Sequence, residues 1–149
     1  MKNNFEEEAN IFSRYKEEIF KTMEQDTYAN HLGIQLIEIK EGMAKAQMTI
    51  KDFMLNSHQT VHGAVTFAIA DYVFACACNS YGKTAVGLST TMNFMTAGKP
   101  GAQLTAIATE QNKNHKLSWY NIRIESDGEL IATMDATAYR KEHYFIPIE

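Results

Sequence analysis

The chain is poor in the features that mark several classes of protein. It has two cysteines, two prolines and one tryptophan in 149 residues, and no apolar run approaches the roughly 18 residues that a membrane-spanning helix needs. Cys76 and Cys78 are separated by a single alanine, a spacing that fits neither a disulfide within one helix nor the common zinc motifs. We therefore expect no disulfide, no metal site and no membrane span, and we interpret both cysteines as small buried residues.

An excess of positive charge is also missing. The formal net charge is −4, whereas domains that bind DNA or RNA are usually basic. The first eight residues are mostly polar or charged and do not resemble the apolar stretch of a signal peptide. These observations argue against a nucleic-acid partner and predict a cytoplasmic protein. A hydrophobic content of 45% is enough for the core of a single domain, which we expect to span residues 1–149.

Alternation of apolar and polar residues predicts an antiparallel sheet. Residues 33–41 and 43–51 alternate on either side of a tight turn at Glu41-Gly42, which indicates a β-hairpin. Turn residues then separate four longer alternating segments, the last two of them joined by Asp127-Gly128. These four predicted strands cover residues 84–96, 102–112, 116–126 and 129–140.

Two helices are predicted from other spacings. Apolar side chains three or four residues apart indicate an amphipathic helix over residues 10–28. The negative charges of Glu6 to Glu8 complement the positive end of the helix dipole at its start. We expect this helix to pack as an outer flap. Residues 63–78 are apolar on nearly every side, which is typical of a buried helix. The expected fold is α+β, with a curved antiparallel sheet around a long central helix and an extra N-terminal helix. The apolar tail, residues 142–149, is expected to dock on the body or on a partner subunit.

Asp71 lies in the middle of the apolar central helix. An ionised carboxylate there loses hydration and needs a compensating partner or a chemical purpose. One interpretation is a structural tie to a lysine, an arginine or a backbone donor. The other is catalysis, because carboxylates in apolar surroundings have the shifted pKa values that acid–base chemistry uses.

The start of the same helix favours the catalytic interpretation. Gly63 stands where the first backbone N–H groups of a helix point outward without partners, and such groups stabilise a developing oxyanion. Close packing at Gly63 and loop hydrogen bonds at His58 and His62 are the ordinary alternatives for each residue alone. Gly63 and Asp71 are eight residues apart, about 12 Å along the helix and roughly 80° around it. One chain therefore cannot place both at one carbonyl, and two antiparallel copies of the helix are required.

A longer motif resembles a known family. The segment from Met54 to Gly63, with Asn56 and His62-Gly63, is followed by Phe67-Ala-Ile-Ala-Asp71 and then by Ala77-Cys-Asn-Ser80. This pattern resembles the PaaI-like branch of the hotdog-fold thioesterases, which is linked to phenylacetate degradation, over residues 30–141. The resemblance implies a hotdog fold, a homodimer commonly paired into a homotetramer, and hydrolysis of acyl-CoA thioesters without a metal or redox cofactor. CoA enters as part of the substrate.

The same resemblance assigns roles by position. Asp71 would be the nucleophile or general base, and the Gly63 N–H of the neighbouring subunit would polarise the thioester oxygen. Asn56 and His62 would orient water, carbonyl or loop. Many members of the family have a second glycine directly after the His-Gly pair, where this chain has Ala64. The alanine adds a methyl group near the place where the acyl group enters. The expected substrate-binding residues are Ala64, Phe67, Ser89 and Thr90.

Two other functions use the same residues. A hotdog enoyl-CoA hydratase or dehydratase would use His62 with Asp71 to move a proton and water across a double bond. A non-catalytic acyl-CoA-binding module would keep the fold without turnover, but it has no need of Asp71. The spacing from Asn56 to Asp71 resembles the thioesterase pattern, so the sequence predicts a thioester hydrolase.

Overall fold

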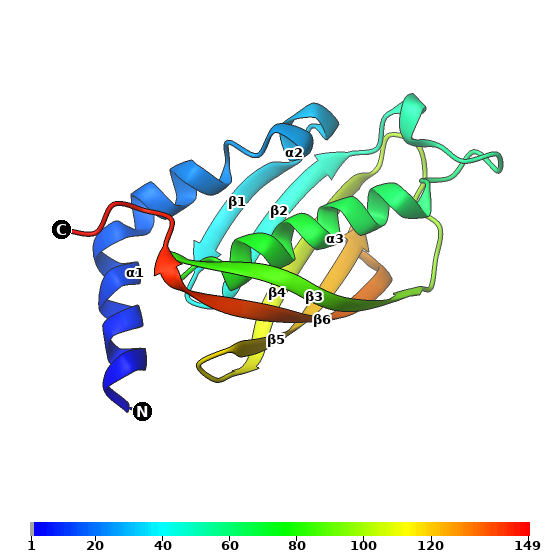
Figure 1. Ribbon diagram of the computed structural model, residues 1–149. Helices are drawn as coiled ribbons and strands as arrows, with labels where there is room; N and C mark the ends of the chain where they lie inside the picture. The colour runs from blue at the N-terminus through cyan, green and yellow to red at the C-terminus, as the bar shows by residue number, and fades with distance from the viewer. Residues whose placement is uncertain (1) are drawn as a thin grey trace.

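A curved antiparallel sheet wraps around one helix (Figure 1). The computed structural model describes residues 2–149, with side chains from Phe5 onwards, and these residues form six strands in the order β1-β2-β4-β5-β6-β3. This arrangement confirms the predicted α+β hotdog fold. The strands are β1 (Gln35–Lys40), β2 (Met43–Thr49), β3 (Lys83–Phe94), β4 (Gln103–Lys113), β5 (Leu117–Ser126) and β6 (Glu129–Tyr144).

The β1–β2 hairpin forms at the predicted turn. Lys40 pairs with Met43, so Glu41 and Gly42 make the connection. Gly42 has φ of +65°, and a Cβ atom there would lie 2.7 Å from the Cβ of Glu110. Glycine is required at this position on both grounds, because it alone combines a left-handed backbone with so close an approach.

The central helix α3 has the predicted bounds, Gly63–Cys78. It packs against the inner face of the sheet, chiefly against β2 and β4, and it buries Ile69, Val73 and Phe74. Most residues of α3 are buried, as predicted, but the helix is not covered all the way round within this chain. Its side away from the sheet leaves Ala64, Phe67 and Asp71 exposed, because the sheet curves around only one side of the helix.

The predicted N-terminal helix exists, but its bounds were wrong. Helix α1 spans Lys2–Met23 and is interrupted at Tyr15, whose φ of −115° and ψ of 19° are not helical. A short second helix, α2 (Thr27–Leu32), follows after Asp26, whose side chain accepts a hydrogen bond from Ala29 N–H at 2.8 Å and so caps the new helix. The acidic residues expected at the start of α1 lie inside it.

Glu8 explains why the helix begins so early. Its side chain is 2% exposed and forms ion pairs with Arg140, Lys83 and Lys113. Burial alone would raise the pKa of Glu8, but these three cations lower it below its ordinary value. The first turns of α1 are therefore held against strands β3, β4 and β6 by charge.

Replacing Glu8 with glutamine is expected to lower the free energy of unfolding by about 3–5 kcal/mol, because it leaves buried Arg140 without its counter-charge. The depressed pKa means that the carboxylate stabilises the fold above its unfolded pKa and ceases to do so as pH falls through the folded value. The free energies of unfolding of the wild type and the variant, measured by urea denaturation, should therefore become similar at acidic pH. Glu7→Gln, an exposed position one residue away, is the control and should change stability by less than about 0.5 kcal/mol. An equal loss in both variants would contradict a specific role for Glu8.

The C-terminal tail docks on the chain itself, as one of the two predicted alternatives had it. Ile146 is buried, and the backbone N–H of Glu149 donates to the Tyr15 hydroxyl at 3.0 Å. Cys76 and Cys78 are unpaired and buried, as predicted. None of the helices in residues 2–149 has the length and apolar character needed to cross a membrane.

Candidate active site

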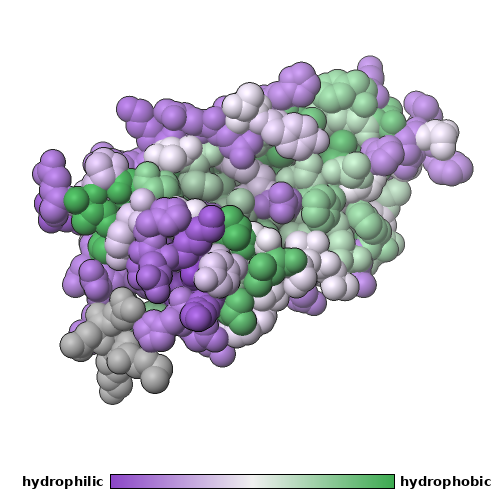
Figure 2. Space-filling view, in the orientation of Figure 1, coloured by the Kyte–Doolittle hydropathy of each residue, from purple (hydrophilic) through white to green (hydrophobic). Residues whose placement is uncertain are grey.

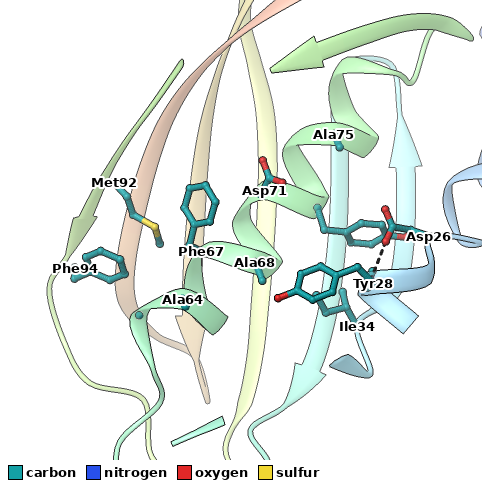
Figure 3. A pocket seen from close by; sticks show the side chains of 13 residues that line it. Asp26, Tyr28, Ile34, Ala64, Phe67, Ala68, Asp71, Ala75, Met92 and Phe94 are labelled. Carbon is teal, nitrogen blue, oxygen red and sulfur yellow. Dashed lines mark hydrogen bonds between the residues drawn. The ribbon is translucent and has the colours of Figure 1, made fainter. Parts of the chain in front are cut away.

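A cavity of about 540 Å³ opens along the side of α3 that the sheet leaves uncovered (Figure 3). Its walls come from α2 and the residues around it, from α3, and from the last residues of β3. The volume lies within the range of small-molecule binding sites. The lining residues are Asp26, Tyr28, Ala29, Ile34, Gly63, Ala64, Phe67, Ala68, Asp71, Tyr72, Ala75, Met92 and Phe94.

Asp71 lies between the two outer walls of this cavity. Figure 3 shows it on α3, with Met92 and Phe94 on one side and Asp26 and Tyr28 on the other. Partial burial among apolar side chains raises the pKa of the Asp71 carboxyl above its ordinary value, and the negative charge of Asp26 adds to this effect. A carboxylate with a raised pKa is a stronger base than an ordinary aspartate.

The structural-tie interpretation of Asp71 was wrong for the single chain. Within residues 5–149, no side chain or backbone N–H donates a hydrogen bond to its carboxylate, and no cation lies within ion-pair distance. Its oxygens therefore remain free to accept a proton or to attack an electrophile.

Gly63 lines the same cavity and has a free backbone donor within the described residues. It is the first residue of α3, and nothing in the described part of the chain accepts a hydrogen bond from its N–H. The next N–H, of Ala64, is already donated to Nδ1 of His62 at 3.0 Å. Gly63 also packs closely: a Cβ atom there would lie 3.3 Å from the ring of Phe94. The two interpretations of Gly63, packing and an oxyanion donor, are compatible.

Asn56 and His62 shape the loop that leads into α3. The Asn56 Oδ1 accepts from the backbone N–H groups of His58 and Thr60 at 2.9 and 3.2 Å, and its Nδ2 donates to the Thr60 hydroxyl at 3.0 Å. His62 is the N-cap of α3. Both side chains hold the loop and the helix start, which is one of the roles expected from the resemblance. Asn56 also lines a second cavity of about 350 Å³, which shares Gly63 and Phe94 with the first.

The predicted substrate-binding residues divide into two groups. Ala64 and Phe67 line the cavity beside Asp71. Ser89 and Thr90 are exposed on β3, but the lining from this strand comes from Met92 and Phe94, which lie closer to its end. The sequence interpretation missed Asp26 and Tyr28 as lining residues. The Asp26-Thr27 pair is a typical helix start and was the available signal for a second helix at this position.

We also searched the described residues for side chains that could bind a metal ion. Within the described part of the chain, no group of three or more His, Cys, Asp or Glu side chains is arranged to hold a metal ion. The expectation that the protein works without a metal or redox cofactor stays a prediction.

Comparison with known proteins covers most of the chain. A putative esterase of Archaeoglobus fulgidus is 34% identical over 138 residues, which are 92% of this chain and 88% of that protein. The acyl-coenzyme A thioesterase PaaI of Escherichia coli is 42% identical over 101 residues, 68% of this chain and 72% of PaaI. The solved structure of the E. coli PaaI protein from the phenylacetic acid degradation operon matches with a TM-score of 0.82 and 31% identity, covering 91% of this chain and 97% of that one.

A family model agrees with these relatives. Residues 58–133, which include Gly63 and Asp71 together with strands β3, β4 and β5, match the thioesterase superfamily. The chain belongs to the thioesterase superfamily.

Proposed function

We propose that this protein is an acyl-CoA thioesterase in which Asp71 is the catalytic carboxylate. The observation that carries the proposal is the state of Asp71: it lines an apolar cavity, has a raised pKa and has no partner among residues 5–149. The acyl-CoA thioesterase PaaI, 42% identical over the aligned residues, supports the choice of a CoA thioester as substrate. The cytoplasmic location stays a prediction.

The chemistry follows from the residues on α3. Hydrolysis replaces the carbon–sulfur bond of the thioester by a carbon–oxygen bond to water. Asp71 either takes the proton from the attacking water or attacks the carbonyl carbon itself, and water then hydrolyses the mixed anhydride. The carbonyl oxygen becomes negative in the tetrahedral intermediate and accepts a hydrogen bond from a Gly63 N–H. The CoA sulfur leaves as a thiolate and is protonated. No step requires a metal or redox cofactor.

We further propose that Asp71 works with Gly63 of a second copy in a two-fold dimer. The eight residues between them separate their positions by about 12 Å along α3, too far for one thioester carbonyl. Two α3 helices running antiparallel would bring each Gly63 to the other Asp71. The homotetramer implied by the family resemblance stays a prediction.

The exposed surface beside α3 supports this dimer. Figure 2 shows apolar surface gathered over the region of α3 and β3. Strand β3 is an edge of the sheet, it is 12 residues long, and most of its residues are exposed. A long exposed edge strand is a ready template for pairing with another chain. Its exposed apolar side chains, Val86, Leu88 and Phe94, would be covered by a partner.

A panel of acyl-CoA thioesters tests the proposed function directly. Release of free thiol is measured for straight-chain, branched and aryl-acyl CoA substrates, before and after treatment with a metal chelator. We expect turnover of at least one substrate, unchanged by the chelator. Addition of water to an enoyl-CoA without thiol release would favour the hydratase alternative. Tight binding of acyl-CoA with no reaction would favour the non-catalytic binding module.

A further inference from the structure

The cavity beside Asp71 contains a second carboxylate. Asp26 caps helix α2 through one oxygen, Oδ1, which accepts from Ala29 N–H at 2.8 Å. This hydrogen bond fixes the position of the side chain at the cavity wall, and Figure 3 shows it on the side of Tyr28. The negative charge of Asp26 acts on Asp71 in the same cavity, since it contributes to the raised pKa of the Asp71 carboxyl.

Positive charge is missing from the same walls. Among the lining residues, which all belong to the described part of the chain, there is no lysine, arginine or histidine. Apart from Asp26 and Asp71 the walls consist of glycine, alanine, isoleucine, methionine and aromatic side chains. An anion that entered would meet two like charges and no counter-charge from this chain, in a setting less polar than water, where such repulsion is strong.

We propose that Asp26 is a specificity-determining residue, which excludes acyl groups that end in a carboxylate and so directs the enzyme to uncharged acyl groups. The inference rests on the proposed function, because it takes the cavity as the place where the acyl group binds next to Asp71. It adds a substrate class that the site rejects, the CoA thioesters of dicarboxylic acids. It also gives the N-terminal segment before the sheet a part in substrate choice.

The size of the effect follows from electrostatics. Two unit charges roughly 6 Å apart, at the effective dielectric constant of about 20 that applies near a protein surface, repel strongly enough to change an equilibrium constant by about 100-fold. Solvent at the open side of the cavity reduces this value. We therefore expect Asp26 to contribute at least about tenfold to discrimination between a neutral and an anionic acyl group.

Asp26→Asn is the appropriate variant, because the asparagine Oδ1 still accepts the Ala29 N–H and asparagine is a good N-cap. Two substrates of nearly equal shape are compared, adipoyl-CoA and 6-methylheptanoyl-CoA, in which a terminal carboxylate replaces an isopropyl end. The readout is the ratio of their kcat/KM values. Asp26 also raises the pKa of Asp71, so the variant changes the rate for every substrate, but the ratio cancels this common effect.

The wild-type enzyme should prefer 6-methylheptanoyl-CoA, and Asp26→Asn should reduce this preference at least about tenfold. Glu24→Gln is the matched control. Glu24 is two residues from Asp26 and carries the same negative charge, but its side chain does not line the cavity. In this variant the ratio of kcat/KM values should stay at the wild-type value. A ratio that Asp26→Asn leaves within twofold of wild type, with 6-methylheptanoyl-CoA still hydrolysed, would overturn the inference alone. Absence of thiol release from every acyl-CoA of the panel, these two included, in the wild-type enzyme would overturn the proposed function and the inference with it.

Discussion

Replacing Asp71 with asparagine is expected to lower kcat for the best acyl-CoA substrate by about 10²–10⁴-fold, the usual contribution of a general base. The dissociation constant of an unreactive thioether analogue should change little, since the apolar walls of the cavity remain. Steady-state thiol release gives the first quantity and calorimetry gives the second. A loss of binding that equals the loss of turnover would contradict a role in the chemical step, and unchanged thiol release would remove Asp71 from the mechanism.

Stability provides an internal control for this variant. The pKa of Asp71 is raised in the folded chain, so the folded state holds its proton at pH values where the unfolded state has lost it. Ionised Asp71 therefore destabilises the fold above its folded pKa, and the penalty disappears as pH falls below the ordinary value of 3.8. Asp71→Asn should melt at a higher temperature than wild type at neutral pH and at a similar temperature in strong acid. An inactive variant with raised stability cannot have lost activity by unfolding.

The raised pKa also predicts the acid side of the pH–rate profile. Asp71 acts only when it is ionised, whether as base or as nucleophile, so kcat/KM should fall as pH drops through its folded pKa. Partial burial, with the added charge of Asp26, moves this fall to a higher pH than for an ordinary aspartate. The same raised pKa underlies the stability prediction: an environment that disfavours ionised Asp71 makes this carboxylate bind a proton more tightly, and so makes it a stronger base.

Local sequence patterns predicted the sheet and the central helix well. Strands β1 to β5 begin and end within two residues of the predicted segments, because the alternation of apolar and polar residues shows directly which side chains face a core. Strand β6 continues to Tyr144, beyond its predicted end at Arg140. Helix α3 has the predicted bounds because a long run of small and apolar residues follows a capping histidine. The position of Asp71 within α3 was equally readable. What periodicity could not show was which side of α3 the sheet leaves open, since its residues are apolar on nearly all sides.

The N-terminal segment was predicted poorly for a physical reason. The start of α1 depends on Glu8, whose partner Arg140 is 132 residues away in sequence. No pattern of neighbouring residues can predict a contact over such a sequence distance. The charged residues before Ile11 were therefore interpreted as solvent-exposed residues that precede the helix. Asp26 was missed as a site residue for the same reason: its approach to the cavity depends on how the break between α1 and α2 folds back over α3.

Gly63→Pro is expected to abolish most activity because it removes one hydrogen-bond donor. One oxyanion donor is worth about 10²–10³-fold in kcat. Proline suits this position, because Gly63 is the first helical residue and His62 has the extended φ and ψ, −63° and 134°, that a residue before proline requires. Gly63→Ala is the matched control, since it adds a Cβ near Phe94 but keeps the N–H, and it should retain far more activity than the proline variant.

Mixing the two inactive variants should restore activity if each site is shared between two chains. In a dimer of one Asp71→Asn chain and one Gly63→Pro chain, one site contains both substitutions and the other contains neither. Random reassociation of equal amounts makes half of the dimers mixed, so about a quarter of all sites regain the native pair and about a quarter of wild-type kcat should return. Mass spectrometry of chains with different tags verifies the exchange. If mixed dimers form and stay inactive, then Gly63 and Asp71 serve one thioester within a single chain, and the distance along α3 must be spanned by substrate or by movement of the loop before Gly63.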